Sequence, residues 1–146
     1  MGVLSGYRII ELSGIGPGPL CGMLFADLGA EVIRIDRKKT ALPNSKPKYD
    51  ITGRNKKSLS LNLKNAESLD VFNKLIKSAD ALIEGFRPGV TEKLGVGPDD
   101  CMKINPKLVY GRITGWGQTG PLSKVAGHDI NYIALAGALY SIGVIE

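Results

Sequence analysis

Short apolar runs that alternate with helical patterns constrain the fold of this 146-residue chain more than any other feature. Five runs have the length and the β-branched and apolar content of strands. Between them, apolar residues recur at the spacing of amphipathic helices. Because strands joined by helices form right-handed crossovers, the pattern predicts an α/β fold with a parallel sheet and flanking helices. The predicted strands are 7–12, 31–36, 58–63, 81–84 and 108–114, and the predicted helices are 19–28, 66–79 and 98–105.

The last apolar run, 130–145, contains no charged residue over its 16 positions. It includes Asn131, Ser141 and two glycines, and it is shorter than a typical membrane-spanning helix. We therefore predict a buried helix here and no membrane span. Such a helix needs a partner surface, yet the sequence stops at Glu146, so we expect the chain to be the N-terminal part of a longer protein.

The positive charge of the chain is concentrated in one segment. Residues 37–64 contain nine Lys or Arg and a single Asp, which gives this segment a charge of +8 against +5 for the whole chain. A solvated face is one interpretation. Nucleic acid binding is disfavoured because Tyr49 is the only aromatic residue that this segment offers for base stacking. The third interpretation is a ligand with several phosphates. Arg37, Arg87 and Lys93 follow predicted strands and would meet at one crevice of a parallel sheet.

The cysteine and histidine content argues against a disulfide scaffold and against a zinc site. The two cysteines, Cys21 and Cys101, lie 80 positions apart, and the chain has one histidine. We expect no bound metal and reduced thiols in an intracellular compartment. The chain opens without the charged-then-apolar pattern of a signal peptide, and no targeting signal is readable.

A glycine-rich loop follows the first predicted strand. Gly14 and Gly16 match the first two glycines of a dinucleotide-binding fingerprint, and Asp36 stands where its ribose-binding acid would lie. The third glycine position, however, holds Pro19. Its ring fills the space that the fingerprint keeps open for close packing of helix and strand. A nicotinamide or flavin site and a plain structural turn both remain as interpretations.

The single histidine, His128, follows a second glycine-rich loop (115–121) and stands at the start of the last helical pattern. One interpretation is a residue that caps the helix. The other is a proton acceptor, because a neutral imidazole accepts protons near pH 7.

Several long motifs resemble those of one known superfamily. The stretches VLSGYRIIELSGIGPGP, DLGAEVIRIDR, IEGFRPGV and TGWGQTGP closely resemble the family III CoA-transferases, and GHDINY (127–132) is similar to the α-methylacyl-CoA racemase branch. The resemblance runs from about Val3 to the C-terminus. It implies a Rossmann-like sheet and assigns 1–146 to the CoA-binding N-terminal part of the large domain, without the rest of that domain or the small domain.

The racemase branch implies an isomerase of fatty acid and lipid metabolism that interconverts (2R)- and (2S)-2-methylacyl-CoA thioesters. By resemblance, His128 is one of two acid/base residues that exchange the α-proton, and backbone N–H groups of 127–132 stabilise the developing oxyanion. Transferases of the superfamily generally lack this histidine and use a later aspartate as nucleophile. The CoA thioester is the substrate, so no cofactor is expected.

The resemblance also implies a set of residues that contact the substrate. Lys93 stands where family members commonly have Arg, which keeps the charge but loses a bidentate fork. The expected contacts are Ile15, Arg37, Leu61, Asn62, Leu63, Lys64, Arg87, Lys93, Gly127, His128, Asp129, Ile130, Asn131 and Tyr132.

The chain departs from the racemase pattern at the second acid/base residue. In the family this is an aspartate downstream of the histidine helix, and neighbouring Asp129 points elsewhere on a helix. We therefore expect this chain to bind CoA and to racemise little. The family implies a homodimer for the full-length form and a mitochondrial or peroxisomal location. The alternatives are a family III CoA-transferase and a non-catalytic acyl-CoA-binding or dimer-modulating module, with a nicotinamide dehydrogenase more distant.

Overall fold

The computed structural model describes residues 2–37 and 50–143. The chain divides into two compact units, Met1–Ile113 and Thr114–Glu146. The basic residues between positions 38 and 49 lie outside the described part of the chain.

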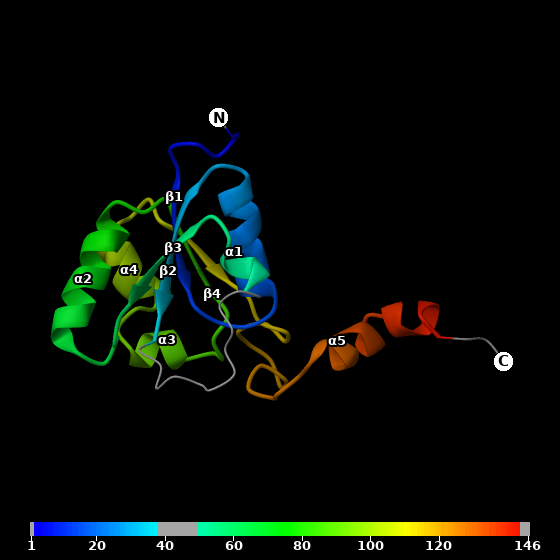
Figure 1. Ribbon diagram of the computed structural model, residues 1–146. Coiled ribbons are helices and arrows are strands. Elements are labelled where there is room, and N and C mark those ends of the chain that lie inside the picture. Colours follow the sequence, from blue (N-terminus) through cyan, green and yellow to red (C-terminus); the bar gives the residue numbers. More distant parts are fainter. Residues whose placement is uncertain (1, 38–49, 144–146) are drawn as a thin grey trace, which may run out of the picture. The chain divides into compact units, whose positions relative to one another are not determined.

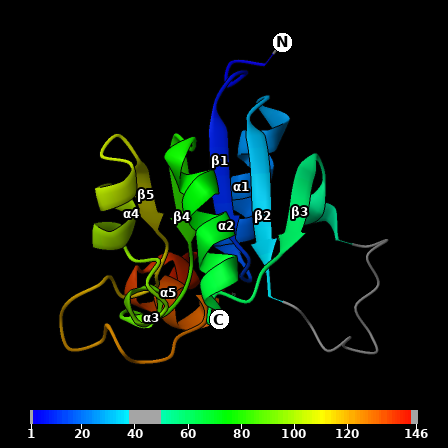
Figure 2. The ribbon, with the colours of Figure 1, turned by 90° about the vertical axis from the view of Figure 1, so that its left-hand side faces the viewer.

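The first unit contains a five-stranded sheet in the order β3-β2-β1-β4-β5, which Figure 2 shows from one face. All four neighbouring pairs are parallel, as the alternation of strands and helices predicts. Strands on both sides of β1 are reached by crossovers in opposite directions, which is the order of a doubly wound, Rossmann-like sheet. The strands are β1 (Arg8–Leu12), β2 (Glu31–Asp36), β3 (Lys56–Ser60), β4 (Ala81–Glu84) and β5 (Val109–Arg112).

Helices cover both faces of this sheet (Figures 1 and 2). On one face, α2 (Ala66–Lys77) and α4 (Pro98–Ile104) enclose the larger core, in which Phe72 and Ile76 are fully buried. On the other face, α1 (Pro17–Asp27) covers a smaller core. The short helix α3 (Val90–Lys93) and the 3-10 turn η2 (Ile51–Gly53) complete the described elements of this unit. The sequence pattern did not predict either of these two short elements.

A buried ion pair crosses the α1 face of the sheet. Lys56 Nζ on β3 lies 2.6 Å from Glu11 Oε2 on β1, and both side chains are 1% exposed. The ammonium also donates to the carbonyl of Pro19 in α1, at 2.8 Å. A Cβ at Gly22 would overlap Glu11 Oε2, so the glycine makes room for the pair. Burial raises the pKa of Glu11, although the hydrogen bond from Lys56 opposes that shift.

This ion pair explains why the predicted position of the third strand was wrong. The apolar alternation predicted 58–63, whereas β3 runs from Lys56 to Ser60. Lys56 and Lys57 resemble loop residues in the sequence. In the sheet their charges are neutralised by Glu11 and Glu31, which belong to β1 and β2.

The second unit contains α5 (Asp129–Leu135) and the 3-10 turn η3 (Ala138–Ser141). The predicted buried helix over 130–145 was therefore wrong in two respects. Gly137 has a φ of +80°, and this left-handed residue separates α5 from η3. In addition, none of the residues 114–143 is buried. No helix in the described part of the chain is long and apolar enough to cross a membrane.

Candidate functional site

A cleft of about 850 Å³ opens at the carboxyl edge of the sheet in the first unit. Segments that follow β1, β2, β3 and β4 contribute to it, which is where open parallel sheets generally bind their ligands. Its size falls within the range of small-molecule sites, about 300–1,000 Å³. The lining residues are Leu12, Ser13, Ile35, Arg37, Leu61, Asn62, Leu63, Lys64, Leu69, Phe86, Val90, Lys93, Leu94 and Gly95.

The segment after β3 is fixed by a turn around Asn62. The side-chain carbonyl of Asn62 accepts the backbone N–H of Lys64 at 3.3 Å, and its amide donates to Asn65 Oδ1 at 3.0 Å. Asn65 is the N-cap residue of α2. The backbone N–H of Leu61 donates to the carbonyl of Asp36 at 2.9 Å, which continues the pairing with β2. The turn thus places Lys64 at the cleft between the end of β3 and the start of α2.

The opposite wall of the cleft comes from the segment after β4. Gly89 has a φ of +84° and precedes α3, so the chain turns sharply before the helix begins. The backbone N–H of Lys93 donates to the carbonyl of Gly89 at 3.2 Å, and that of Leu94 donates to Val90 at 3.2 Å. This short helix places Val90, Lys93 and Leu94 along the cleft. We refer to residues 86–95 as the cleft wall.

The chemistry of the cleft is apolar with a set of cations. Arg37, Lys64 and Lys93 are exposed, and within the described ranges 2–37 and 50–143 none of them forms an ion pair. Other cations of the basic segment do have carboxylate partners, as Lys56 and Lys57 show. An apolar groove with unneutralised cations is suited to a ligand that combines apolar groups with phosphates.

The structure brings together six of the residues expected to contact the substrate. These are Arg37, Leu61, Asn62, Leu63, Lys64 and Lys93. Two others lie outside the lining: Ile15 is 90% exposed in the loop between β1 and α1, and Arg87 is exposed beside Phe86. Their contact with a ligand remains a prediction.

Sequence reasoning missed most of the apolar lining. Leu12 and Ile35 end buried strands, and Leu69 belongs to the apolar face of α2, so each has the pattern of an ordinary core residue. Four of the apolar lining residues nevertheless stand inside the recognised motifs, and this was the signal in the sequence that could have marked them: Leu12, Ile35, Phe86 and Val90.

The glycine loop after β1 does not contribute Gly14, Gly16 or Gly18 to the cleft lining. Helix α1 begins at Pro17, with Gly16 at a φ of +72° as its N-cap residue. Pro19 is buried and occupies the third-glycine position, and its carbonyl accepts the hydrogen bond from Lys56. This arrangement favours the structural-turn interpretation over a dinucleotide fingerprint.

The second unit holds the remaining predicted residues, Gly127 to Tyr132. His128 is exposed and is the N-cap residue of α5, so the expected position at the start of a helix is confirmed. Its backbone N–H donates to Asn131 Oδ1 at 2.9 Å. The ring of Tyr132 meets that of Trp116 edge to face, with centroids 4.8 Å apart. A Cβ at Gly127 would lie 2.8 Å from the Tyr132 ring, so this glycine permits the close packing.

The chain is a member of CoA-transferase family III, whose sequence model matches residues 4–144. It is 49% identical over 141 residues to the alpha-methylacyl-CoA racemase of Mus musculus, across 97% of this chain and 35% of that protein. With the Homo sapiens racemase it shares 48% identity over 142 residues, across 96% of this chain and 35% of that protein.

A solved structure agrees with this membership. The orthorhombic crystal form of Rv3272 from Mycobacterium tuberculosis superposes with a TM-score of 0.85 at 35% identity, over 99% of this chain and 42% of that one. The chain thus spans about a third of the length of the racemases that it matches.

Proposed function

We propose that the first unit binds the CoA part of an acyl-CoA thioester in the cleft at the carboxyl edge of the sheet. The observation that carries this proposal is the convergence of Arg37, Lys64 and Lys93 on one apolar groove, from the segments that follow three different strands. CoA carries several phosphates and an adenine ring. The cations supply charge-assisted hydrogen bonds to the phosphates, and side chains such as Phe86 supply apolar contact for the ring.

Calorimetric titration of the 146-residue chain with CoA tests this proposal. We expect Arg37→Ala, Lys64→Ala and Lys93→Ala each to weaken CoA binding at least about tenfold, because a hydrogen bond to a charged group contributes about 1.5–3 kcal/mol and about 1.4 kcal/mol is a factor of ten. Lys74→Ala is the matched control, since Lys74 is an exposed lysine in the last turn of α2 and does not line the cleft. If all four variants bind CoA like the parent chain, the cleft is not the CoA site.

We propose further that the whole enzyme acts as an α-methylacyl-CoA racemase and that His128 exchanges the α-proton of the substrate. The 48–49% identity to two racemases supports this assignment. A neutral imidazole can remove the proton, and inversion then needs a second group that returns one to the opposite face. His128 is the only histidine of the sequence, and Asp129 starts the same helix. We therefore expect little inversion by the 146-residue chain alone.

The α-proton of a 2-methylacyl-CoA can be followed in deuterated buffer, together with the configuration of the product. We expect any exchange catalysed by the chain to fall about 10²–10⁴-fold in His128→Ala, the range over which a positioned general base contributes. Lys124→Ala, at an exposed position of the same unit, is the control. Exchange that is equal in His128→Ala and the control would remove the assigned role. Stereoinverting turnover by the unaltered chain would contradict the need for a second group.

The same incubation distinguishes the related transferase chemistry. Movement of CoA from the thioester to a free carboxylic acid, without exchange of the α-proton, would identify a family III CoA-transferase. A homodimer and a peroxisomal or mitochondrial location belong to the racemase proposal and are tested separately, by sedimentation and by imaging of the tagged full-length protein.

A further inference from the structure

Arg112, at the end of β5, joins two carboxylates that lie on different segments of the chain. Its Nε donates to Glu84 Oε1 at 2.9 Å, and its Nη1 donates to Glu92 Oε1 at 2.7 Å. Its Nη2 donates to Thr91 Oγ1 at 3.2 Å and to Glu92 Oε2 at 3.3 Å. Arg112 is not among the residues that line the cleft. A single guanidinium therefore connects the end of β4 with helix α3, outside the proposed ligand site.

The carboxylate of Glu84 holds the beginning of the cleft wall. Its side chain is fully buried, and its second oxygen accepts the backbone N–H of Phe86 at 2.6 Å. Thr91, in the middle of the wall, is also fully buried. The backbone N–H of Val96 donates to the carbonyl of Thr91 at 3.0 Å. The wall is thus tied to the sheet at its start and again through α3, and Arg112 contributes to both attachments.

The wall that Arg112 holds supplies one side of the cleft. Phe86, Val90, Lys93, Leu94 and Gly95 all line it. We infer that Arg112 is a positioning residue for the ligand site: its fork between Glu84 and Glu92 holds the wall that carries Phe86 and Lys93. This inference rests on the proposed binding of CoA in the cleft.

Arginine suits this role better than lysine. The planar guanidinium donates to both carboxylates and to Thr91 at once, in a fixed geometry. A lysine at position 112 would keep the charge, but its single ammonium cannot hold the same three groups in one plane. Because Glu84 is fully buried, the ammonium would be drawn to that carboxylate and Glu92 would be released.

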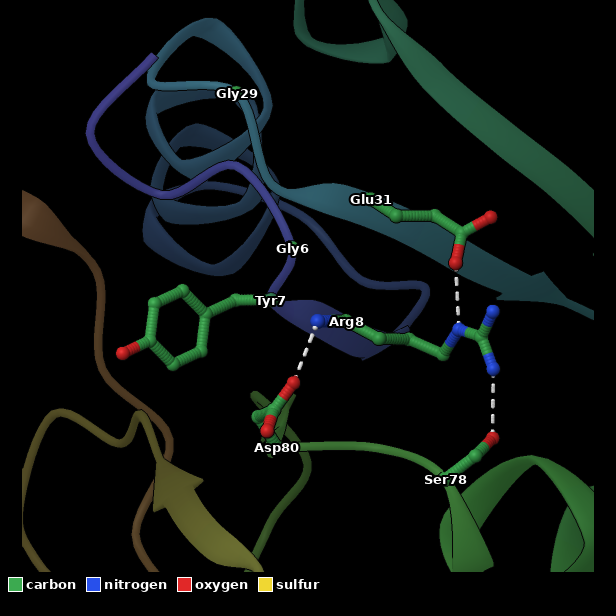
Figure 3. Close-up of a pocket in the computed structure, with 7 residues that line it drawn as sticks. All are labelled: Gly6, Tyr7, Arg8, Gly29, Glu31, Ser78 and Asp80. Atoms are coloured by element: carbon green, nitrogen blue, oxygen red, sulfur yellow. Dashed lines mark hydrogen bonds and ion pairs between the residues drawn. The ribbon is translucent and has the colours of Figure 1, made fainter. Parts of the chain in front are cut away.

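The opposite edge of the sheet offers a matched control. Arg8 donates from Nε to Glu31 at 2.5 Å and from Nη1 to Ser78 Oγ at 2.7 Å, so it too joins a carboxylate and a hydroxyl (Figure 3). It lies at the start of β1 and lines a separate cavity. Arg8→Lys therefore makes the same chemical change as Arg112→Lys without affecting the cleft wall.

Amide hydrogen exchange of the ligand-free 146-residue chain tests the attachment directly. We expect Arg112→Lys to speed exchange at the amides of residues 93–96 at least tenfold, while Arg8→Lys changes those amides less than twofold. Glu92→Gln provides a second variant, because the side chain of Glu92 is 46% exposed and its replacement leaves the buried carboxylate of Glu84 paired. Protection of 93–96 that is unchanged in both Arg112→Lys and Glu92→Gln would overturn the inference.

Calorimetry with CoA then tests whether the attachment affects ligand binding. We expect Arg112→Lys to weaken CoA binding about five- to tenfold and Arg8→Lys to change it less than twofold. If the parent chain and both variants bind CoA equally, the positioning role is wrong while the proposed function stands. If the parent chain does not bind CoA, both the proposed function and the role toward the ligand fall, whatever the exchange rates show.

Discussion

Both edges of the sheet place cations beside a cavity, but the cations of the two edges differ in whether they have a carboxylate partner. At the amino edge, Arg8 lines a cavity of about 340 Å³, and its guanidinium is bonded to Glu31 and Ser78 while its backbone N–H donates to Asp80 at 2.8 Å (Figure 3). At the carboxyl edge, Arg37, with Lys64 and Lys93, lines the larger cleft without an ion-pair partner in the described part of the chain.

This difference separates two cavities that are both lined by charged residues: the cation of one is paired with a carboxylate, and the cations of the other have no such partner in the described residues. Where a cation is already paired with a carboxylate of the same fold, the ion pair stabilises the folded chain and leaves no free charge for a ligand. Where it is left without a partner beside apolar surface, binding of an anion costs no internal ion pair. We therefore propose a structural role for the amino edge and a binding role for the carboxyl edge.

The largest effect on stability is expected at the buried pair between Glu11 and Lys56. Lys56→Met should lower the free energy of unfolding by about 3–5 kcal/mol, because it leaves a buried carboxylate without its partner. Lys57→Met, at the adjacent residue with a 71% exposed side chain, should change it by about 0–1 kcal/mol. Urea denaturation measures both. The double variant Glu11→Leu/Lys56→Met should recover much of the loss, and a loss equal to that of Lys56→Met alone would contradict this explanation.

One arginine variant at each edge of the sheet should affect either stability or CoA binding, but not both. Arg8→Met should lower the free energy of unfolding by about 1–2 kcal/mol, since it removes bonds to Glu31 and Ser78, and it should leave CoA affinity unchanged. Arg37→Ala should do the reverse, with about tenfold weaker CoA binding and a stability within about 0.5 kcal/mol of the parent chain. Denaturation and calorimetry on the same preparations give both quantities. Parallel losses in both variants would mean that the edges do not differ as proposed.

Salt should distinguish the edges by a smaller amount. We expect CoA affinity to fall several-fold as the ionic strength rises from about 0.05 to 0.5 M, because exposed cations and phosphates are screened over this range. The fall in CoA affinity with ionic strength should be smaller in Lys64→Ala, because this variant has lost one of the charges that contact the phosphates. An affinity that does not depend on salt would show that the cations of the cleft do not contact the phosphates.

The smallest effect concerns pH and Glu31. Hydrogen bonds from Lys57 and Arg8 hold the pKa of Glu31 below its usual value near 4.5. A lowered pKa means that the unfolded state binds the proton first, so this stabilisation is present above about pH 4.5 and is lost as the pH falls through the folded-state pKa. The stability of the parent chain should exceed that of Glu31→Gln at pH 6, and the difference should shrink toward pH 3. A constant difference over this range would contradict the role of the charged form.

The positions of most strands and long helices could be predicted from local sequence, because each has a period that matches its structure. Strands β1, β2 and β4 and helix α2 are close to their predicted ranges. The position of β3 could not be predicted from local sequence, since the charges of Lys56 and Lys57 are neutralised by residues 45 and 26 positions away. The prediction of one buried helix over 130–145 was wrong for a different reason: Gly137, at a positive φ, interrupts the helix, and the apolar composition of the run is not matched by burial.

Some residues of the candidate site could likewise be predicted from the sequence, and others could not. The cations Arg37, Lys64 and Lys93 could be identified from the sequence because they follow strand ends or lie within recognisable motifs. The apolar lining could not be predicted, because Leu12 or Ile35 has the pattern of any core residue until the neighbouring elements are in place. The role inferred for Arg112 could not be predicted either, because its partners Glu84 and Glu92 are distant in the sequence.

By itself, the sequence determined the α/β class, the parallel sheet and the family, because these depend on periodicity and on motifs that are local in the chain. The tertiary structure alone decided the strand order, which cations are neutralised, and that Arg87 lies outside the cleft lining. The reason is physical: a charge has its partner through space, and the partner of Lys56 or Arg112 lies on another strand.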